Sequence, residues 1–275
     1  MSENPQIGSY KYYERLYEVE GEHWWFRGIR TITAGILDAR YQGAKNLHIL
    51  DAGCGTGVTL TWLKRYSLPK QIVGIDLSWY ALQFCQRRGH PLLCQSSVLE
   101  LPFKSNLFDL IVCHDVLQHL PGNSSDKIAL GEFYRTLKPG GCLLVRTNSS
   151  QGMGRGKSLK EEDYRMYRLD ELCDKVQQKG FRILKATYAN SLLSIFPTVK
   201  RYLRQRKNHR SHHHNQGLAV RLLPPPLRWL NILLYGVMKG EAWFLSKPSR
   251  ILPFGHTIIL LVQKPGLENG DHSKI

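Results

Sequence analysis

Short apolar runs alternate with amphipathic stretches through most of this chain of 275 residues. Residues 47–51, 71–76 and 108–114 are apolar runs of strand length that end in a polar side chain, and apolar residues at helical spacing follow them. Strands that alternate with helices build a parallel sheet with helices on both faces. The pattern therefore predicts an α/β protein with a doubly wound, mostly parallel sheet.

The same reading places the remaining elements. It predicts further strands over 91–95, 142–147, 181–188 and 256–262. It predicts helices over 10–20, 25–41, 78–88, 125–137, 169–179 and 227–245, with another helix starting at Val58. Residues 138–141, Lys-Pro-Gly-Gly, combine a helix stop with a tight-turn signal.

A glycine-rich segment follows the first predicted strand, at residues 51–57, with the sequence Asp-Ala-Gly-Cys-Gly-Thr-Gly. In an open parallel sheet, ligands bind beyond the carboxyl ends of the strands. Glycines without a Cβ let the backbone approach a ligand closely. Asp76 ends the next strand, where an acid accepts hydrogen bonds from the ribose hydroxyls of an adenosine.

The glycine spacing distinguishes between two nucleotide-containing cofactors. A dinucleotide site has the spacing Gly-x-Gly-x-x-Gly and places a pyrophosphate at the start of the helix. Here the spacing is Gly-x-Gly-x-Gly, and Asp51 precedes it by two residues. A carboxylate there repels a pyrophosphate but suits a cofactor with an amino group and a sulfonium, which favours S-adenosylmethionine over NAD.

Several motifs in this order resemble the class I S-adenosylmethionine-dependent methyltransferases, in particular the type 11 group. They are residues 49–57, Asp76, and the segments Glu-Leu-Pro-Phe at 100–103, 108–112, Val-Leu-Gln-His-Leu at 116–120 and 137–141. The segment 22–27, Glu-His-Trp-Trp-Phe-Arg, resembles a bacterial subgroup. The resemblance implies a Rossmann-like seven-stranded sheet with an antiparallel last strand and a helical insertion before it.

The resemblance and the loop together predict the cofactor contacts. They are Asp51, Ala52, Gly53, Cys54, Gly55, Gly57, Asp76, Leu77, Ser97, Val98, His114, Arg27, Trp25 and Tyr13. Ser97 departs from the family pattern, in which an Asp reaches the adenine amino group. Arg27 is expected to bind the cofactor carboxylate, with an aromatic face near the sulfonium; packing of the N-terminal helices against the sheet is the alternative for this aromatic cluster.

Three residues beyond the fourth strand are the candidates for the reacting end: His114, Asp115 and His119. Methyl transfer is an in-line displacement that depends mainly on alignment, and a base helps when the acceptor is a hydroxyl group. In a helical arrangement Asp115 and His119 share one face, so His119 is predicted to act as a base that Asp115 orients. Packing of His119 at the sheet end is the alternative.

The positive charge of the chain is concentrated before the last strand. The formal net charge is +16, and residues 191–250 contain eleven Lys and Arg but one acid, Glu241. A basic run near the apolar helix 227–245 predicts a small-molecule or lipid-linked acceptor, with peripheral membrane contact through 200–245. A solvated basic loop followed by a core helix is the alternative. Nucleic acid is not expected, because basic charge alone gives nonspecific affinity. The histidines at 212–214 are consecutive, and no metal site is predicted.

The predicted organisation has five parts: an N-terminal helical cap (1–44), a cofactor-binding core (45–190), a basic and helical insertion that acts as a substrate lid (191–253), the final core strand (254–265) and a tail (266–275). The start has no signal-peptide pattern, and the six cysteines form no Cys-x-x-Cys pair, which indicates reduced thiols in a cytoplasmic protein. An NAD-type oxidoreductase and a non-catalytic cofactor-binding protein are the alternatives to a methyltransferase.

Overall fold

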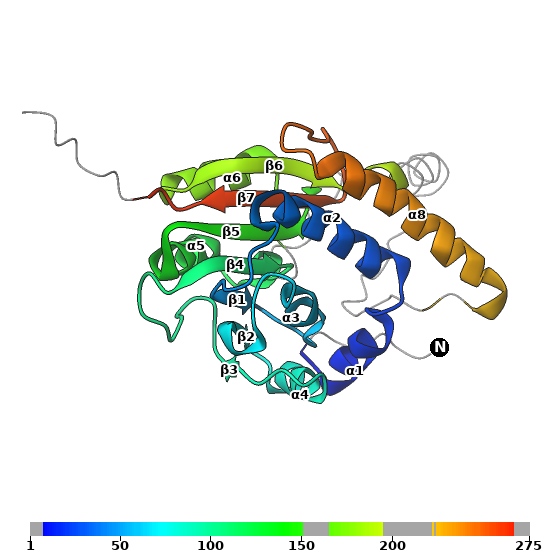
Figure 1. Cartoon of the computed structure of the whole chain (residues 1–275), viewed down its shortest axis with the longest axis horizontal. Helices are drawn as coiled ribbons and strands as arrows, with labels where there is room; N and C mark the ends of the chain where they lie inside the picture. The colour runs from blue at the N-terminus through cyan, green and yellow to red at the C-terminus, as the bar shows by residue number, and fades with distance from the viewer. Residues whose placement is uncertain (1–7, 151–164, 195–221, 223, 267–275) are drawn as a thin grey trace, which may run out of the picture.

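The computed structural model describes residues 8–150, 165–194, 222 and 224–266 (Figure 1). Its strands form one seven-stranded sheet in the order β3-β2-β1-β4-β5-β7-β6. The strands are β1 (Ile49–Ala52), β2 (Ile72–Asp76), β3 (Leu93–Gln95), β4 (Phe108–His114), β5 (Leu137–Asn148), β6 (Arg182–Ala189) and β7 (Thr257–Gln263). Strands β1 to β5 pair in parallel, and β7 pairs antiparallel to both β5 and β6. The predicted sheet is confirmed, including its antiparallel last strand.

Helices cover both faces of the sheet. They are α1 (Tyr10–Val19), α2 (Trp24–Tyr41), α3 (Val58–Leu63), α4 (Trp79–Arg87), α5 (Ser125–Thr136), α6 (Leu169–Gln178) and α8 (Arg228–Leu245), with short 3-10 turns η1 (Pro69–Gln71), η2 (Leu117–His119) and η4 (Pro225–Leu227). Side chains of α5 and α6 form one core cluster with the sheet, and those of α2, α3, α4 and α8 form the other. The sheet is therefore a buried middle layer, which explains its apolar strands.

The fifth strand starts earlier than the sequence predicts. Residues 138–141 belong to β5, and Leu137 pairs with Phe108 before a register shift next to Leu110. Gly140 has a φ of +80° within this irregular stretch. The expected tight turn is therefore wrong, because the Pro-Gly-Gly segment is taken up as a bulge at the start of a strand rather than as a loop.

Helix α8 packs along α2 on one side of the sheet (Figure 1). Gly28 of α2 permits this contact, because a Cβ there would lie 2.5 Å from the Cβ of Met238. Asn231 ties the two helices together, since its Oδ1 accepts from the Trp24 N–H at 2.8 Å and its Nδ2 donates to the Glu22 carbonyl at 3.0 Å. The basic segment around 200–210 and the histidines at 212–214 lie outside the described residues.

No helix in the described part of the chain is long and apolar enough to cross a membrane. The six cysteines are free thiols, and the sulfurs of Cys54 and Cys85 lie 3.7 Å apart.

Candidate functional site

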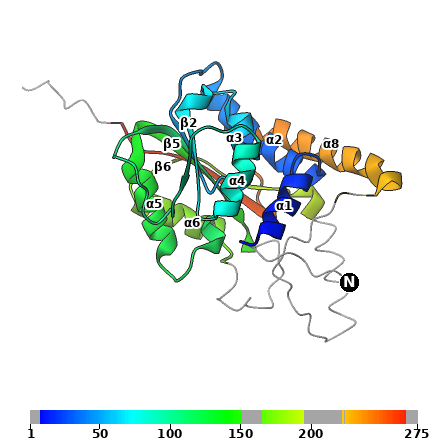
Figure 2. The ribbon, with the colours of Figure 1, turned by 90° about the horizontal axis from the view of Figure 1, so that it is seen from below.

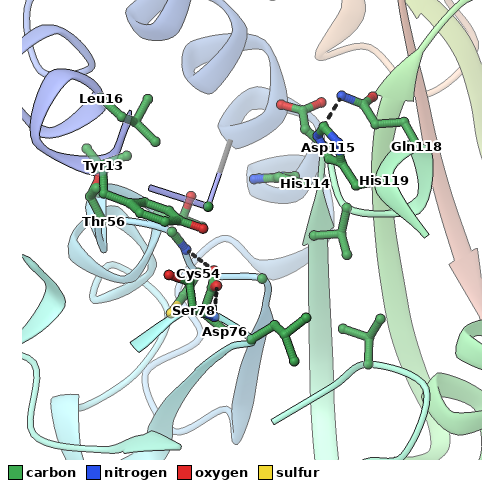
Figure 3. A pocket seen from close by; sticks show the side chains of 18 of the residues that line it. Tyr13, Leu16, Cys54, Thr56, Asp76, Ser78, His114, Asp115, Gln118 and His119 are labelled. Carbon is green, nitrogen blue, oxygen red and sulfur yellow. Dashed lines mark hydrogen bonds between the residues drawn. The ribbon is translucent and has the colours of Figure 1, made fainter. Parts of the chain in front are cut away.

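A cavity of about 1030 Å³ opens at the carboxyl ends of the parallel strands. The loops after β1, β2, β3 and β4 form its floor, and α1 and α2 contribute its opposite wall (Figure 3). Its volume reaches the upper end of the range for small-molecule sites, about 300–1,000 Å³. The cavity therefore has room for a nucleoside-sized cofactor together with an acceptor.

The three loop glycines serve different purposes. All have positive φ, at +84° for Gly53, +54° for Gly55 and +86° for Gly57. A Cβ on Gly53 would lie 2.1 Å from the Cγ2 of Val116, and one on Gly57 would lie 3.0 Å from the Sγ of Cys85. A Cβ on Gly55 would meet nothing closer than 4.0 Å. Two glycines are thus required by packing, while Gly55 presents open backbone to the cavity.

Asp76 lies at the predicted strand end and faces the cavity. Its Oδ2 accepts from the Gly55 N–H and its Oδ1 from the Ser78 N–H, both at 2.9 Å (Figure 3). Burial raises the pKa of Asp76, while the hydrogen bonds from Ser78 and Gly55 oppose that shift. The backbone N–H groups of Ser78, Gly55 and Leu77 all interact with this carboxylate, and since a carboxylate has about four acceptor sites, Asp76 can still accept a hydrogen bond from a ligand hydroxyl group.

Asp51 is fully buried beneath the loop and does not line the cavity. Neither carboxylate oxygen has a hydrogen-bond partner within the described part of the chain. Burial, followed by the nearby charge of Asp76, raises the pKa of Asp51 well above its usual range. The predicted cofactor contacts of Asp51 and Ala52 stay predictions, and the structure shows that β1 continues to Ala52 and buries both residues outside the cavity lining. Gly57 also lies outside the cavity lining.

Leu77, Ser97 and Val98, three of the predicted site residues, line the cavity. The Ser97 Oγ accepts from the Leu99 N–H at 3.1 Å and so caps the turn after β3. Its hydroxyl hydrogen stays available for a ligand acceptor, whereas the family's Asp accepts only. The structure therefore places Ser97 where the sequence predicts an adenine contact, with a donor in place of a carboxylate.

His114 ends β4 and lines the cavity with a fully buried ring. Neither ring nitrogen has a hydrogen-bond partner among the described residues. The ring stacks on Trp62 of α3, with centroids 6.4 Å apart and an interplanar angle of 19°. Burial, and secondarily the charge of Arg146, lowers the pKa of His114 well below its usual range. A neutral imidazole is therefore held at the cavity wall.

The arrangement of Asp115 and His119 is not helical, and the prediction that they share a helical face is wrong. Asp115 has a φ of +57°, and His119 belongs to the 3-10 turn η2. The carboxylate of Asp115 binds Arg146 of β5, whose Nη2 lies 2.5 Å from Oδ2. His119 lies beside Gln118, with its Nε2 3.4 Å from the Gln118 Nε2 (Figure 3). Burial lowers the pKa of His119, and the charge of Asp115 opposes this.

Of the two arginines in and after the N-terminal aromatic segment, Arg30 lines the cavity and the predicted Arg27 does not. The Arg27 guanidinium lies 4.2 Å from the ring centre of Tyr235 on α8, outside the cavity lining. Residues two apart, such as Trp25 and Arg27, point about 200° apart around a helix. Because Trp25 of α2 faces the cavity, Arg27 faces away from it. Phe26 and Arg30 share a face at i and i+4, and both line the cavity. Trp25 and Tyr13 line it as predicted.

Sequence reasoning missed Glu20, which lines the cavity and is buried. It accepts a hydrogen bond from the Thr56 hydroxyl and pairs with Arg88 at 2.8 Å. Burial raises the pKa of Glu20, and the contacts with Thr56 and Arg88 oppose this. Glu20 links α1 to the glycine loop and to α4, which sequence spacing alone does not reveal.

Comparisons with known proteins match the core of the chain. Residues 50–145 match the family model described as a methyltransferase domain. The chain is 36% identical over 119 residues to a demethylmenaquinone methyltransferase of Lactiplantibacillus plantarum, covering 40% of this chain and 49% of that protein. It is 30% identical over 141 residues to a tRNA (carboxymethyluridine(34)-5-O)-methyltransferase of Arabidopsis thaliana, covering 49% of this chain and 32% of that protein.

A solved structure extends the comparison to the whole fold. The crystal structure of the cyclase SpnF superposes with a TM-score of 0.61 and 19% identity, covering 97% of this chain and 100% of that chain. The chain spans about half or less of the length of the two curated relatives above. These matches agree with the predicted methyltransferase family, and the solved structure agrees with the predicted fold. Residues 50–145 of this chain match the family model of a methyltransferase domain, and the chain is similar in sequence to curated methyltransferases.

Proposed function

We propose that the chain transfers a methyl group from S-adenosylmethionine to an oxygen or nitrogen atom of a small-molecule or lipid-linked acceptor. The observation that carries this proposal is the position of Asp76 at the end of β2, bonded to the Gly55 and Ser78 N–H groups and facing a cavity with room for two ligands. When bound, the cofactor supplies a methyl group activated by a positive sulfur.

The residues present fit that cofactor. Asp76 accepts from the ribose, Leu77 and Val98 contact the base, and Ser97 donates at the base edge. The two oxygens of Asp51 are buried without a hydrogen-bond partner among the described residues, beneath the glycine loop that lines the cavity. Burying a charged carboxylate without a partner costs free energy, and a positively charged ligand nearby lowers that cost. Two arginines line the cavity; Arg146 is paired with Asp115, and Arg30 binds the cofactor carboxylate.

The acceptor binds at the strand ends of β4 and β5. Trp25, Phe26 and Trp62 provide apolar walls there, close to His114. These walls exclude water and align the acceptor with the sulfur–methyl axis, which supplies most of the barrier reduction in such transfers. A neutral imidazole at His114 or His119 accepts a proton from a hydroxyl acceptor. Arg146 holds the carboxylate of Asp115, and the charge of Asp115 favours the protonated form of the His119 ring.

Domain organisation follows from the same proposal. Residues 1–44 cap the cavity through α1 and α2, residues 45–190 hold the cofactor, and residues 254–265 complete the sheet. Within the insertion 191–253, α8 packs on α2, and the role of the insertion as a substrate lid stays a prediction. A cytoplasmic location stays a prediction.

Methyl transfer from labelled S-adenosylmethionine tests the proposal directly. The purified chain is incubated with three acceptor classes: an isoprenoid quinone precursor, a polyprenyl-phosphate sugar and transfer RNA. Label in either of the first two extracts, absent with Asp76→Ala, supports the proposal. Label in transfer RNA alone would replace the acceptor class, in line with the tRNA-methylating relative. Cofactor binding with no transfer to any class would favour the non-catalytic alternative.

A further inference from the structure

The outer face of α8 carries an apolar stripe that no described element covers. Trp229, Ile232, Leu233 and Trp243 are between 55% and 69% exposed. At 3.6 residues per turn these four side chains fall within about 100° of the helix circumference. The opposite face of α8 is occupied, because Met238, Ala242 and Leu245 are buried against α2 and the sheet. The stripe is therefore a surface feature of a firmly seated helix.

Four exposed positive charges lie around this stripe, and the nearby Asp38, which lines a hollow with Lys239 and Trp243, is paired with Arg65. Arg228 and Lys239 flank it on one side of the helix, and Lys247 and Arg250 follow its end. The one acid of α8, Glu241, is buried, and its carboxylate accepts from the backbone N–H groups of Asn190 and Ser191. The surface thus combines exposed apolar side chains with a net positive rim.

We propose that this face of α8 docks on an anionic lipid surface. Tryptophan prefers the boundary between headgroups and acyl chains, and amphipathic helices with a cationic polar edge lie in that boundary. Each Lys or Arg near an anionic bilayer adds about 1 kcal/mol of attraction. A second copy of the chain fits this face less well, because two such surfaces would bring like charges together.

Docking through α8 places the cavity close to the membrane. Helix α2 lies between α8 and the cavity, with Met238 on one side of it and Phe26 and Arg30 lining the cavity on the other (Figures 1 and 2). The inference goes beyond the proposed methyl transfer and does not depend on it, since lipid binding is measured without cofactor or acceptor.

Vesicle flotation with the full chain tests the inference. Binding is measured on vesicles of phosphatidylcholine alone and of phosphatidylcholine with phosphatidylglycerol in equal parts. We expect binding to the anionic vesicles only. The double variant Trp229→Ser/Ile232→Ser should weaken it at least tenfold, and Lys239→Ala about fivefold. Ile128→Ser on α5, a side chain that is 51% exposed, is the matched control and should leave binding unchanged.

Two further measurements keep the test decisive. Thermal unfolding and S-adenosylhomocysteine binding of each variant show that the fold and the cavity are intact. Absence of binding to anionic vesicles, or equal binding to both vesicle types, would overturn the inference. So would a dimer, seen by light scattering, that the double variant converts to monomer, because the stripe would then be a contact between copies.

Discussion

The guanidinium of Arg146 holds the carboxylate of Asp115 across the ends of β5 and β4, with Nη2 2.5 Å from Oδ2. The pair is partly buried, and both residues line the cavity. Asp115 has a φ of +57°, a conformation that Asp and Asn adopt more readily than other residues with a side chain. The pair therefore fixes the backbone between β4 and η2, and with it the positions of His114 and His119.

Asp115 substitutions separate the charge from the backbone strain. Asp115→Ala should lower the free energy of unfolding by about 2 kcal/mol, since it loses the ion pair and adds left-handed strain. Asp115→Asn keeps a residue suited to this φ and should cost about 1 kcal/mol less. Chemical denaturation of both variants measures the difference. Equal losses in the two variants would show that backbone strain contributes nothing at this position.

Alanine substitutions at two glycines of the loop should destabilise the fold to different extents. Gly53→Ala should lower the free energy of unfolding by about 3 kcal/mol, because its Cβ overlaps Val116 and its φ is positive. Gly55→Ala meets open space and should cost about 1 kcal/mol for its φ alone. Thermal and chemical unfolding compare them.

The double variant Gly53→Ala/Val116→Ala serves as the control for overlap. It removes the methyl group that the new Cβ would strike, so it should regain part of the stability lost in Gly53→Ala. If it instead adds a further loss, the clash with Val116 is not the cause.

Two arginines of α2 give a matched pair for cofactor binding. Arg30 lines the cavity, whereas Arg27 lies over Tyr235. Arg30→Ala should weaken S-adenosylhomocysteine binding about tenfold, the effect of losing one charge-assisted hydrogen bond. Arg27→Ala should change it less than threefold. Calorimetric titration of both variants decides the matter, and the reverse order would restore the original prediction for Arg27.

Stability should depend on pH through His114. Its pKa is lowered in the folded state, so the unfolded chain binds more protons as the pH falls through about 6.5, the ordinary histidine value. The contribution of His114 to the free energy of unfolding is therefore constant above that pH, and the free energy of unfolding falls as the pH drops below it. His114→Gln should reduce the slope of unfolding free energy against pH, between pH 6.5 and 5.5, by about one proton. A slope equal to that of the unmodified chain would mean that the ring is protonated in the folded state.

Local patterns predicted the fold because each strand and helix carries its own periodicity. The alternation of apolar runs fixed the order of the elements, and the glycine loop with Asp76 located the cofactor end of the cavity. The failures concern contacts made in three dimensions. Arg27 and Arg30 both lie in a basic, aromatic segment, and only the packing of α2 on α8 decides which one faces the cavity.

Turns between elements were the other source of error. The prediction for Asp115 and His119 assumed a helix that the positive φ of Asp115 prevents, and Arg146 came from a strand whose sequence gave no signal of an ion pair. Glu20 was missed because its partners Thr56 and Arg88 lie far from it in the sequence, so that no local pattern indicates their contact.

The most direct test of the central claim is calorimetric titration of the purified chain with S-adenosylhomocysteine, alongside NAD and the Asp76→Ala variant. The account predicts micromolar binding of S-adenosylhomocysteine, at least a thirtyfold loss in Asp76→Ala and no binding of NAD. Binding of NAD in place of S-adenosylhomocysteine, or binding of S-adenosylhomocysteine that Asp76→Ala leaves unchanged, would contradict it.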